Sequence, residues 1–307
     1  MNANAELVDL TVDLRPIQRV DDDGDLSPHR RMLLAFAQNK LAVAGVALLL
    51  AIVLFSFVGP LVYHTDQVRT NFAQADLAPG ADGHPLGTDA SGYDVLGRLM
   101  AGGQTSLIVG FAAAAIAAVV GSIFGAIAGL AGKVVDSVLM RFVDGCMSIP
   151  QLLVVIILAT IIIPSRLSLA IVIGAISWFP TARLVRGEAL RIVRLDYVEA
   201  SRASGSPSRW VLFRHILPNS VGVIVVSATF QVATAILLVA SLSFLGLGIP
   251  PPAASWGGML ATGLQYIYDG YWWMIYPAGA LIVLTIMGCN FVADGLRDAF
   301  ETRLQRR

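Results

Sequence analysis

The sequence predicts an all-α, polytopic membrane protein, and three observations support this fold class. Hydrophobic residues make up 56% of the 307 positions, and charged residues only 14%. The mean hydropathy is +0.72, whereas a soluble domain of this length needs far more polar surface around its core. The apolar residues also gather in runs of roughly 20, the length that an α-helix needs to cross a bilayer. These features exclude a soluble globular enzyme and a disordered chain.

Six apolar runs follow one another along the chain, and each predicts one membrane-spanning helix. The runs are too long and too continuous for the alternating strands of a membrane barrel. Together they form a six-helix domain over 40–300, and their approximate bounds are 41–58, 107–130, 138–163, 167–185, 221–245 and 273–292. Pro150 and Pro180 lie within the third and fourth runs, where they predict kinks.

The lysines and arginines predict the orientation of these helices. If the N-terminus is cytosolic, 18 of the 21 cations lie on cytosolic segments and 3 on external ones. The positive-inside rule therefore places both termini in the cytosol. Residues 1–39 are expected to be a largely mobile cytosolic tail with an acidic cluster, and residues 301–307 a short cytosolic C-terminal tail. The first run is not a cleaved signal peptide, because about 40 residues that include this acidic cluster precede it. The formal net charge of zero argues against nucleic-acid binding.

Three connections between the spans are long: 61–104 and 244–272 outside, and 186–218 inside. The internal connection is amphipathic, with arginines interleaved among apolar residues. Gly205 is expected to end a helix in the left-handed conformation. Ser206 is then expected to cap a second helix and Pro207 to occupy its first position. Such a segment is either a surface helix at the lipid headgroups or a docking element for a cytosolic partner.

The internal connection resembles the cytoplasmic loop of ABC-importer permeases. That family pattern reads Glu-Ala-Ala, three residues, Gly, nine residues, Ile, any residue, Leu-Pro. The chain has Glu199-Ala200-Ser201, then Gly205, His215 and Leu217-Pro218 at these positions. It departs from the pattern at Ser201, a small residue in place of Ala, and at His215, which matches the form found in peptide importers.

Four further stretches are similar to dipeptide and oligopeptide permeases of the peptide/nickel family. They are 84–99, 140–150, 241–260 and 293–300, in the order that is found in the second, C-type permease subunit. The resemblance implies a type I importer permease fold. It also implies a multi-pass protein of the bacterial cytoplasmic membrane that moves di- or oligopeptides inward. Nickel chelates, glutathione and haem are alternative substrates of related permeases.

The resemblance further implies the partners of this chain. They are a second homologous permease, two cytosolic subunits that bind ATP and Mg, and an extracytoplasmic peptide-binding protein. The external segments 61–104 and 244–272 are expected to dock that binding protein. The residues expected to couple the chain to the ATPases are Glu199, Ala200, Ser201, Gly205, Arg209, Arg214, Leu217 and Pro218.

Small and polar residues inside the spans carry additional expectations. Gly121, Gly125 and Gly129 recur at four-residue spacing and predict close helix packing. Arg141 and Asp144 are three residues apart and are expected to pair. Four polar residues of the fifth run share one helical face, which either lines the translocation pathway or makes interhelical hydrogen bonds. These residues are Ser227, Gln231, Thr234 and Ser241.

No pattern in the sequence predicts chemistry by this chain itself. Gly132-Lys133 lacks the remaining residues of a phosphate-binding loop, and neither a zinc-protease motif nor a nucleophile elbow occurs. Cys146 and Cys289 are expected to be small core residues. We therefore expect no catalytic residue, metal or cofactor on the chain, and ATP to act through other polypeptides. The competing interpretation, a secondary transporter or channel, is less favoured because the central spans lack Asp and Glu.

Overall fold

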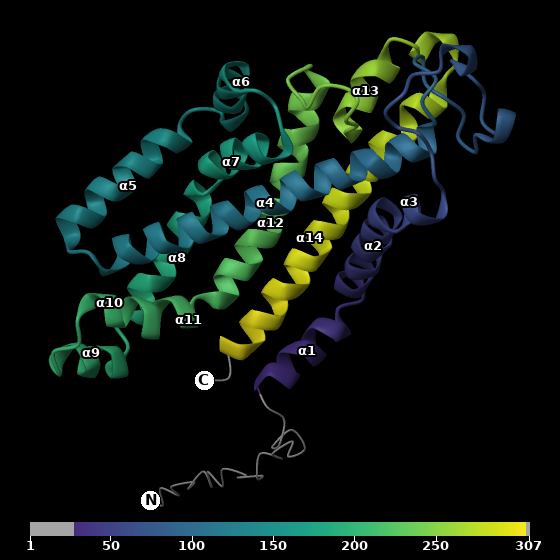
Figure 1. The fold of residues 1–307 in the computed structure, drawn as a ribbon. Helices are drawn as coiled ribbons and strands as arrows, with labels where there is room; N and C mark the ends of the chain where they lie inside the picture. Colours follow the sequence, from purple (N-terminus) through teal and green to yellow (C-terminus); the bar gives the residue numbers. More distant parts are fainter. Residues whose placement is uncertain (1–27, 305–307) are drawn as a thin grey trace, which may run out of the picture.

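The computed structural model describes residues 28–304, and within this range it contains α-helices, short 3-10 helices and one π-helix, with no strand (Figure 1). The all-α fold class is thus confirmed. Four helices are long and apolar enough to cross a membrane: α2 (Lys40–Phe57), α4 (Val95–Leu130), α12 (Val221–Phe244) and α14 (Tyr276–Leu304). The spans number up to six if each of two bent helix pairs counts as one span.

The two bent pairs correspond to the third and fourth apolar runs. α5 (Lys133–Met147) and α6 (Gln151–Ile161) meet at 79°, and α7 (Arg166–Ser177) and α8 (Phe179–Ile192) meet at 45°. The kinks predicted from Pro150 and Pro180 are confirmed, because proline has no N–H to donate and its ring clashes with the preceding turn. The third run, expected as one kinked helix, is broken into two.

α4 forms the centre of the bundle and packs against α2, α7, α8 and α12 (Figure 1). It begins at Val95, about three turns before the predicted start at 107, so the last residues of the expected 61–104 segment are helical. Asp94 caps the helix, since its Oδ1 accepts the N–H of Gly97 at 2.7 Å. The first turns hold Gly102, Gly103 and Gln104, which hydropathy does not mark as part of a span.

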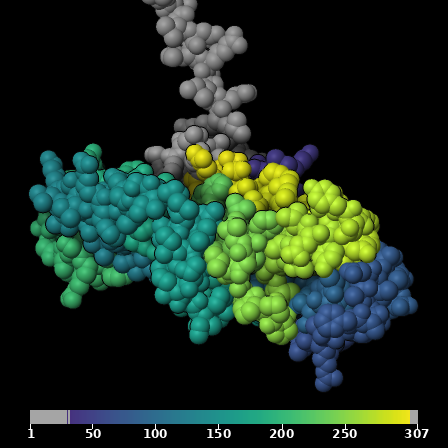
Figure 2. Space-filling view, turned by 90° about the horizontal axis from the view of Figure 1, so that it is seen from above, coloured from purple at the N-terminus to yellow at the C-terminus, as the bar shows by residue number. Residues whose placement is uncertain are grey.

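One end of the bundle is built from two segments that are far apart in the sequence. The 63–94 segment follows α3 (Gly59–Val62) and contains the short helices η1 (Phe72–Gln74) and η2 (Ala81–Gly83). The 245–275 segment contains α13 (Trp256–Leu264), η4 (Ile267–Asp269) and η5 (Trp272–Met274). Seen from above, the blue atoms of the first segment lie against the yellow-green atoms of the second (Figure 2). The indole N–H of Trp273 donates to the carbonyl of Thr88 at 3.2 Å.

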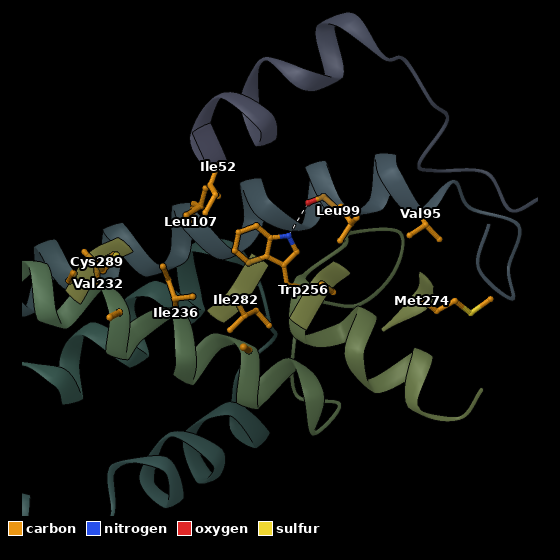
Figure 3. Packing of buried hydrophobic residues seen from close by; sticks show 14 of the residues in the cluster. Ile52, Val95, Leu99, Leu107, Val232, Ile236, Trp256, Met274, Ile282 and Cys289 are labelled. Carbon is orange, nitrogen blue, oxygen red and sulfur yellow. Dashed lines mark hydrogen bonds between the residues drawn. The ribbon is translucent and has the colours of Figure 1, made fainter. Parts of the chain in front are cut away.

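Trp256 anchors α13 to the start of α4. Its side chain is fully buried, and its indole N–H donates to the carbonyl oxygen of Leu99 at 2.9 Å (Figure 3). The same apolar cluster includes Ile236 of α12 and Ile282 of α14. Burial of these large side chains stabilises the central part of the bundle and joins three of its long helices.

The opposite end of the bundle holds α1 (Pro28–Gln38) beside the last turns of α14 (Figure 1). The amide of Asn39 donates to Asp298 Oδ2 at 3.1 Å. The segment expected as a tail up to residue 39 therefore ends in an ordered helix, and α14 continues through Leu304 into the expected C-terminal tail. The acidic cluster at 21–25 lies outside the described residues.

Candidate functional site

An arm of short helices projects from the same end of the bundle as α1. The arm comprises residues 193–220 and contains α9 (Asp196–Ala203), α10 (Ser208–Val211), the π-helix η3 (Leu212–Ile216) and α11 (Leu217–Asn219) (Figure 1). α8 continues to Ile192, so the first residues of the expected 186–218 connection are helical. Pro218 explains the π-helix: it cannot donate to the carbonyl of Arg214, so the turn before it widens.

A small apolar cluster holds the arm against the bundle. Val198 of α9, Val211 of α10 and Ile216 of η3 are buried together with Val185 and Ile192 of α8. The burial of these side chains fixes α9 relative to the end of α8. A displacement of α8 is therefore transmitted to the arm.

Gly205 forms the sharp turn between α9 and α10. Its φ of +84° is left-handed, as predicted, and a Cβ at this position would meet nothing within 4 Å. Glycine is thus required by the backbone conformation and not by crowding within this chain. The predicted cap is displaced by one residue: Pro207, in extended conformation, is the N-cap of α10. The Ser206 hydroxyl oxygen instead accepts a hydrogen bond from the Ser201 hydroxyl at 2.9 Å.

Most of the residues expected to couple to the ATPases lie on the outer surface of the arm. Ser201 and Leu217 are half-buried, and the exposed ones are Glu199, Ala200, Gly205, Arg209, Arg214 and Pro218. Two large apolar side chains that the motif does not include, Trp210 and Phe213, are 54% and 63% exposed. Their position among the arginines of an amphipathic segment is the signal that could have singled them out.

Two ion pairs connect α5 to α8. Arg186 donates from Nε and one terminal nitrogen to the two carboxylate oxygens of Asp136, each at 2.5 Å. Asp144 pairs with Arg183 of α8, so the expected pair between Arg141 and Asp144 is replaced by a contact between helices. Arg183 lies on the helix that faces Asp144, so its guanidinium reaches the carboxylate directly across the interface. α5 is thereby attached to the helix that leads into the arm.

The predicted glycine stripe faces α8. A Cβ on Gly121 would lie 2.7 Å from the carbonyl oxygen of Trp178, and one on Gly129 would lie 2.5 Å from the Cβ of Ala189. A Cβ on Gly125 would overlap the carbonyl oxygen of Ala182. Glycine at these positions allows the α4 and α8 backbones to approach closely.

The four polar residues of α12 divide into two pairs. Ser227 and Gln231 are buried and bond to the α7–α8 pair: the Ser227 and Thr181 hydroxyls are 2.8 Å apart, and the Gln231 amide donates to the Ser177 carbonyl. Thr234 and Ser241 are more exposed and bond to their own helix, at the carbonyls of Phe230 and Leu237. The interhelical alternative therefore describes the first pair.

The end opposite the arm contains a cavity of about 360 Å³ between the 245–275 segment and the start of α4. Asp89 and Arg98 line it, with Arg98 Nε 3.8 Å from Asp89 Oδ2, and Arg98 also donates to the carbonyl of Pro252 at 2.6 Å. Burial raises the pKa of Asp89, against the opposing effect of the N–H groups of Tyr93 and Ser91.

A second polar cluster at this end centres on Asp94. Its Oδ2 accepts the hydroxyl of Tyr63 at 2.9 Å and lies 2.8 Å from His84 Nδ1. Burial and the hydrogen bond with Asp94 raise the pKa of Tyr63 to about 12. Asp94 thus holds the 63–94 segment to the start of α4. Within the described residues, no group of three or more His, Cys, Asp or Glu side chains could hold a metal ion.

Helices of membrane-spanning length and apolarity around a glycine-packed centre, with an exposed basic arm at one end, define the class of polytopic membrane proteins. The sequence matches two family models. Residues 121–306 match the binding-protein-dependent transport system inner membrane component, and residues 27–79 match the N-terminal TM domain of oligopeptide transport permease C. The chain belongs to the first of these families, the permeases of ABC importers.

Relatives of this chain cover most of its length. It is 38% identical over 281 residues to the oligopeptide transport system permease protein OppC of Bacillus subtilis, covering 92% of each chain. It is 39% identical over 269 residues to the dipeptide transport system permease protein DppC of the same organism, covering 88% of this chain and 84% of the relative. It is 40% identical over 269 residues to OppC of Escherichia coli, covering 87% and 89%.

Proposed function

We propose that this chain is one half of a heterodimeric pore that imports di- or oligopeptides across the cytoplasmic membrane of a bacterium. The exposed arm with its left-handed turn at Gly205 carries the proposal, because an ATP-driven importer needs a rigid element that receives force from its ATPases. The peptide substrate is inferred from the names of the relatives. ABC permeases for nickel chelates, glutathione or haem are the alternative.

The partners in this proposal are a second permease, two ATP-binding subunits that hold ATP and Mg, and a peptide-binding protein. Hydrolysis takes place on the ATPases, and this chain contributes no catalytic group. Both termini and the arm face the cytosol, in agreement with the distribution of lysines and arginines. The opposite end, built from the 63–94 and 245–275 segments, faces outward and docks the binding protein. Crosslinks from these segments to the binding protein test this orientation, and crosslinks confined to the partner permease contradict it.

Coupling through the arm predicts the effect of changes at Gly205. A valine there must adopt a left-handed conformation that costs about 1–2 kcal/mol, which corresponds to a factor of roughly 5–30 in the population of the docked arm. We expect the Gly205→Val complex to insert and assemble normally but to take up peptide at a rate reduced by about this factor, while the ATPases still hydrolyse ATP. The measurement is uptake of labelled peptides into proteoliposomes that contain the whole complex.

The matched control is Gly205→Asn, because asparagine tolerates the left-handed region. It should keep most of the uptake. Wild-type uptake by the Gly205→Val complex would refute the assignment of the arm as the element that couples to the ATPases. A panel of dipeptides, longer peptides, nickel chelates, glutathione and haem in the same vesicles identifies the substrate class. Loss of uptake after removal of the ATPase subunits separates this function from that of a secondary transporter or channel.

A further inference from the structure

The break between α7 and α8 is stabilised by a side chain from a third helix. α7 ends at Ser177 and α8 begins at Phe179, and the last carbonyls of a helix have no partner within it. The amide of Gln231 on α12 donates to the carbonyl oxygen of Ser177, and both residues are buried. Gln231 thus replaces a backbone hydrogen bond that the break removes.

A second bond holds the other side of the break. Ser227 lies one turn before Gln231 on α12, and its hydroxyl is 2.8 Å from the hydroxyl of Thr181 on α8. Ser177 and Thr181 flank the interruption at Trp178. α12 therefore binds α7 through one side chain and α8 through another, so the two bonds tie both sides of the break to one helix.

The other bent pair is connected to the same position. Gln151, the first residue of α6, donates from its amide to the Ser177 hydroxyl at 2.6 Å. On the far side of both breaks, α5 and α8 are joined by the ion pairs of Asp136 and Asp144 described above. The ion pairs join α5 to α8. The break between α5 and α6 and the break between α7 and α8 are joined to each other through the hydrogen bond at Ser177.

The arm lies beyond the far end of α8, so its position depends on the direction of α8 after this break, which the backbone contact with α4 also constrains. α8 has 14 residues and is therefore about 21 Å long, so a change of about 10° in the bend moves its far end by about 4 Å. The arm follows α8 after a connection of residues 193–195 and is packed against it. A small change at Ser177 is therefore amplified into a large displacement of α9.

We propose that Gln231, assisted by Ser227, is a positioning residue for ATPase coupling. It contacts neither the transported solute nor the ATPases, and acts by holding the α7–α8 bend at the angle that places the arm for docking. The proposal rests on the coupling role of the arm that is proposed above. It also assigns to Gln231 and Ser227 a role other than lining the translocation pathway.

The test is Gln231→Met in the complete complex, reconstituted with the partner permease, the ATPases and the binding protein. Methionine has a similar length but cannot donate to the Ser177 carbonyl. We expect the amount of peptide imported per ATP hydrolysed to fall by about threefold or more. Ser227→Ala should produce a smaller fall, and Ser227→Thr, which keeps the hydroxyl, should restore the ratio.

The matched control is Gln104→Met. The amide of Gln104 on α4 also donates to a backbone carbonyl of another helix, that of Ser56 on α2, at 2.9 Å, but it lies away from both breaks. If such bonds only stabilise the fold, Gln231→Met and Gln104→Met should lower the thermal stability of the complex to a similar extent. Only Gln231→Met should change the ratio of import to hydrolysis.

A second readout measures the bend directly. Spin labels at Leu167 of α7, which is 70% exposed, and at Arg202 of α9, which is exposed, report the distance across the break once Cys146 and Cys289 are replaced by alanine. We expect Gln231→Met to shift or broaden this distance by several ångströms, comparable with the displacement of about 4 Å for a 10° bend. Gln104→Met should leave it unchanged.

Both readouts must change together for the proposal to stand. A Gln231→Met complex with a wild-type import ratio, or with a wild-type distance, overturns it. If this variant does not assemble, the same two measurements on Ser227→Ala and Ser227→Thr decide the matter by the same criteria. A wild-type complex that imports no peptide while the distance still responds to Gln231→Met refutes the proposed function and leaves the positioning of the arm intact.

Discussion

The close contact between α4 and α8 predicts that Gly125→Ala destabilises the protein. A Cβ at Gly125 would overlap the carbonyl oxygen of Ala182 and lie 3.0 Å from its Cα and carbonyl carbon. Carbon atoms in good contact are separated by about 3.5–4.0 Å. Because the clashing atoms belong to the backbone, the two helices must separate by about 0.5–1 Å.

The expected magnitude follows from this separation. A gap of this size forfeits roughly a quarter to a half of the dispersion energy of the affected contacts, and overpacking of a core costs about 1–3 kcal/mol. Alanine has a higher helix propensity than glycine by about 1 kcal/mol, which offsets part of this cost. Because the clashing atoms belong to the backbone and cannot rotate away, the overpacking cost lies at the upper end of its range, at about 2–3 kcal/mol. The expected net loss is therefore about 1–2 kcal/mol.

The assay is thermal unfolding of the purified complex in detergent, followed by the fraction that remains monodisperse after heating at a fixed rate. A fixed rate is needed because unfolding of such proteins is commonly irreversible. The expected loss corresponds to a decrease in Tm of about 2–4 °C, at about 2 °C per kcal/mol for a chain of this size.

Gly187→Ala is the matched control. Gly187 lies on α8, the same helix that Gly125 contacts, but a Cβ there would meet nothing within 4 Å. The control should melt at the wild-type temperature or slightly above it. A Gly125→Ala complex that melts together with the control would refute the view that α4 and α8 are held in contact through their backbones.

Two further predictions concern single hydrogen bonds. Trp256→Phe removes the indole N–H that donates to the Leu99 carbonyl and should cost about 0.5–1.5 kcal/mol, because that carbonyl lies within α4 and keeps its helical partner. The Tm should fall, whereas Trp272→Phe, at a half-exposed position, should have little effect. Equal shifts would contradict this prediction. Asn39→Ala removes the cap of α2, where the side chain accepts the N–H groups of Leu41 and Ala42 at 3.1 Å, and should cost about 0.5–2 kcal/mol. Asn39→Ser should recover most of that loss in the same melting assay, and no recovery would argue against capping.

Hydropathy predicted the spans well where the helix and the apolar run coincide. α2 and α12 begin and end within about one residue of their predicted bounds, because lipid requires apolar side chains over the length of a span. It missed the start of α4, where Gly102 and Gly103 are buried by Ser56 and Trp256 and not by lipid. No local pattern marks a helix whose neighbours come from distant segments.

Local chemistry predicted the turn at Gly205, since glycine populates the left-handed region without steric cost. It also predicted that Pro150 and Pro180 interrupt their helices. It did not predict the partner of Asp144, because sequence spacing can pair residues only within one helix. Arg183 belongs to another helix, and only the folded bundle brings it to Asp144.

The sequence by itself determined which segments are apolar enough to span a membrane, their order and the motif of the arm, and its lysines and arginines predict the direction of insertion. These properties depend on residues close together in the chain and on the surrounding lipid and water. Only the tertiary structure decided the angle of each bend and the hydrogen-bond partner of Gln231, whose amide reaches a carbonyl 54 residues away. A side chain in a bilayer must find its hydrogen-bond partner within the protein, so packing and not sequence spacing selects that partner.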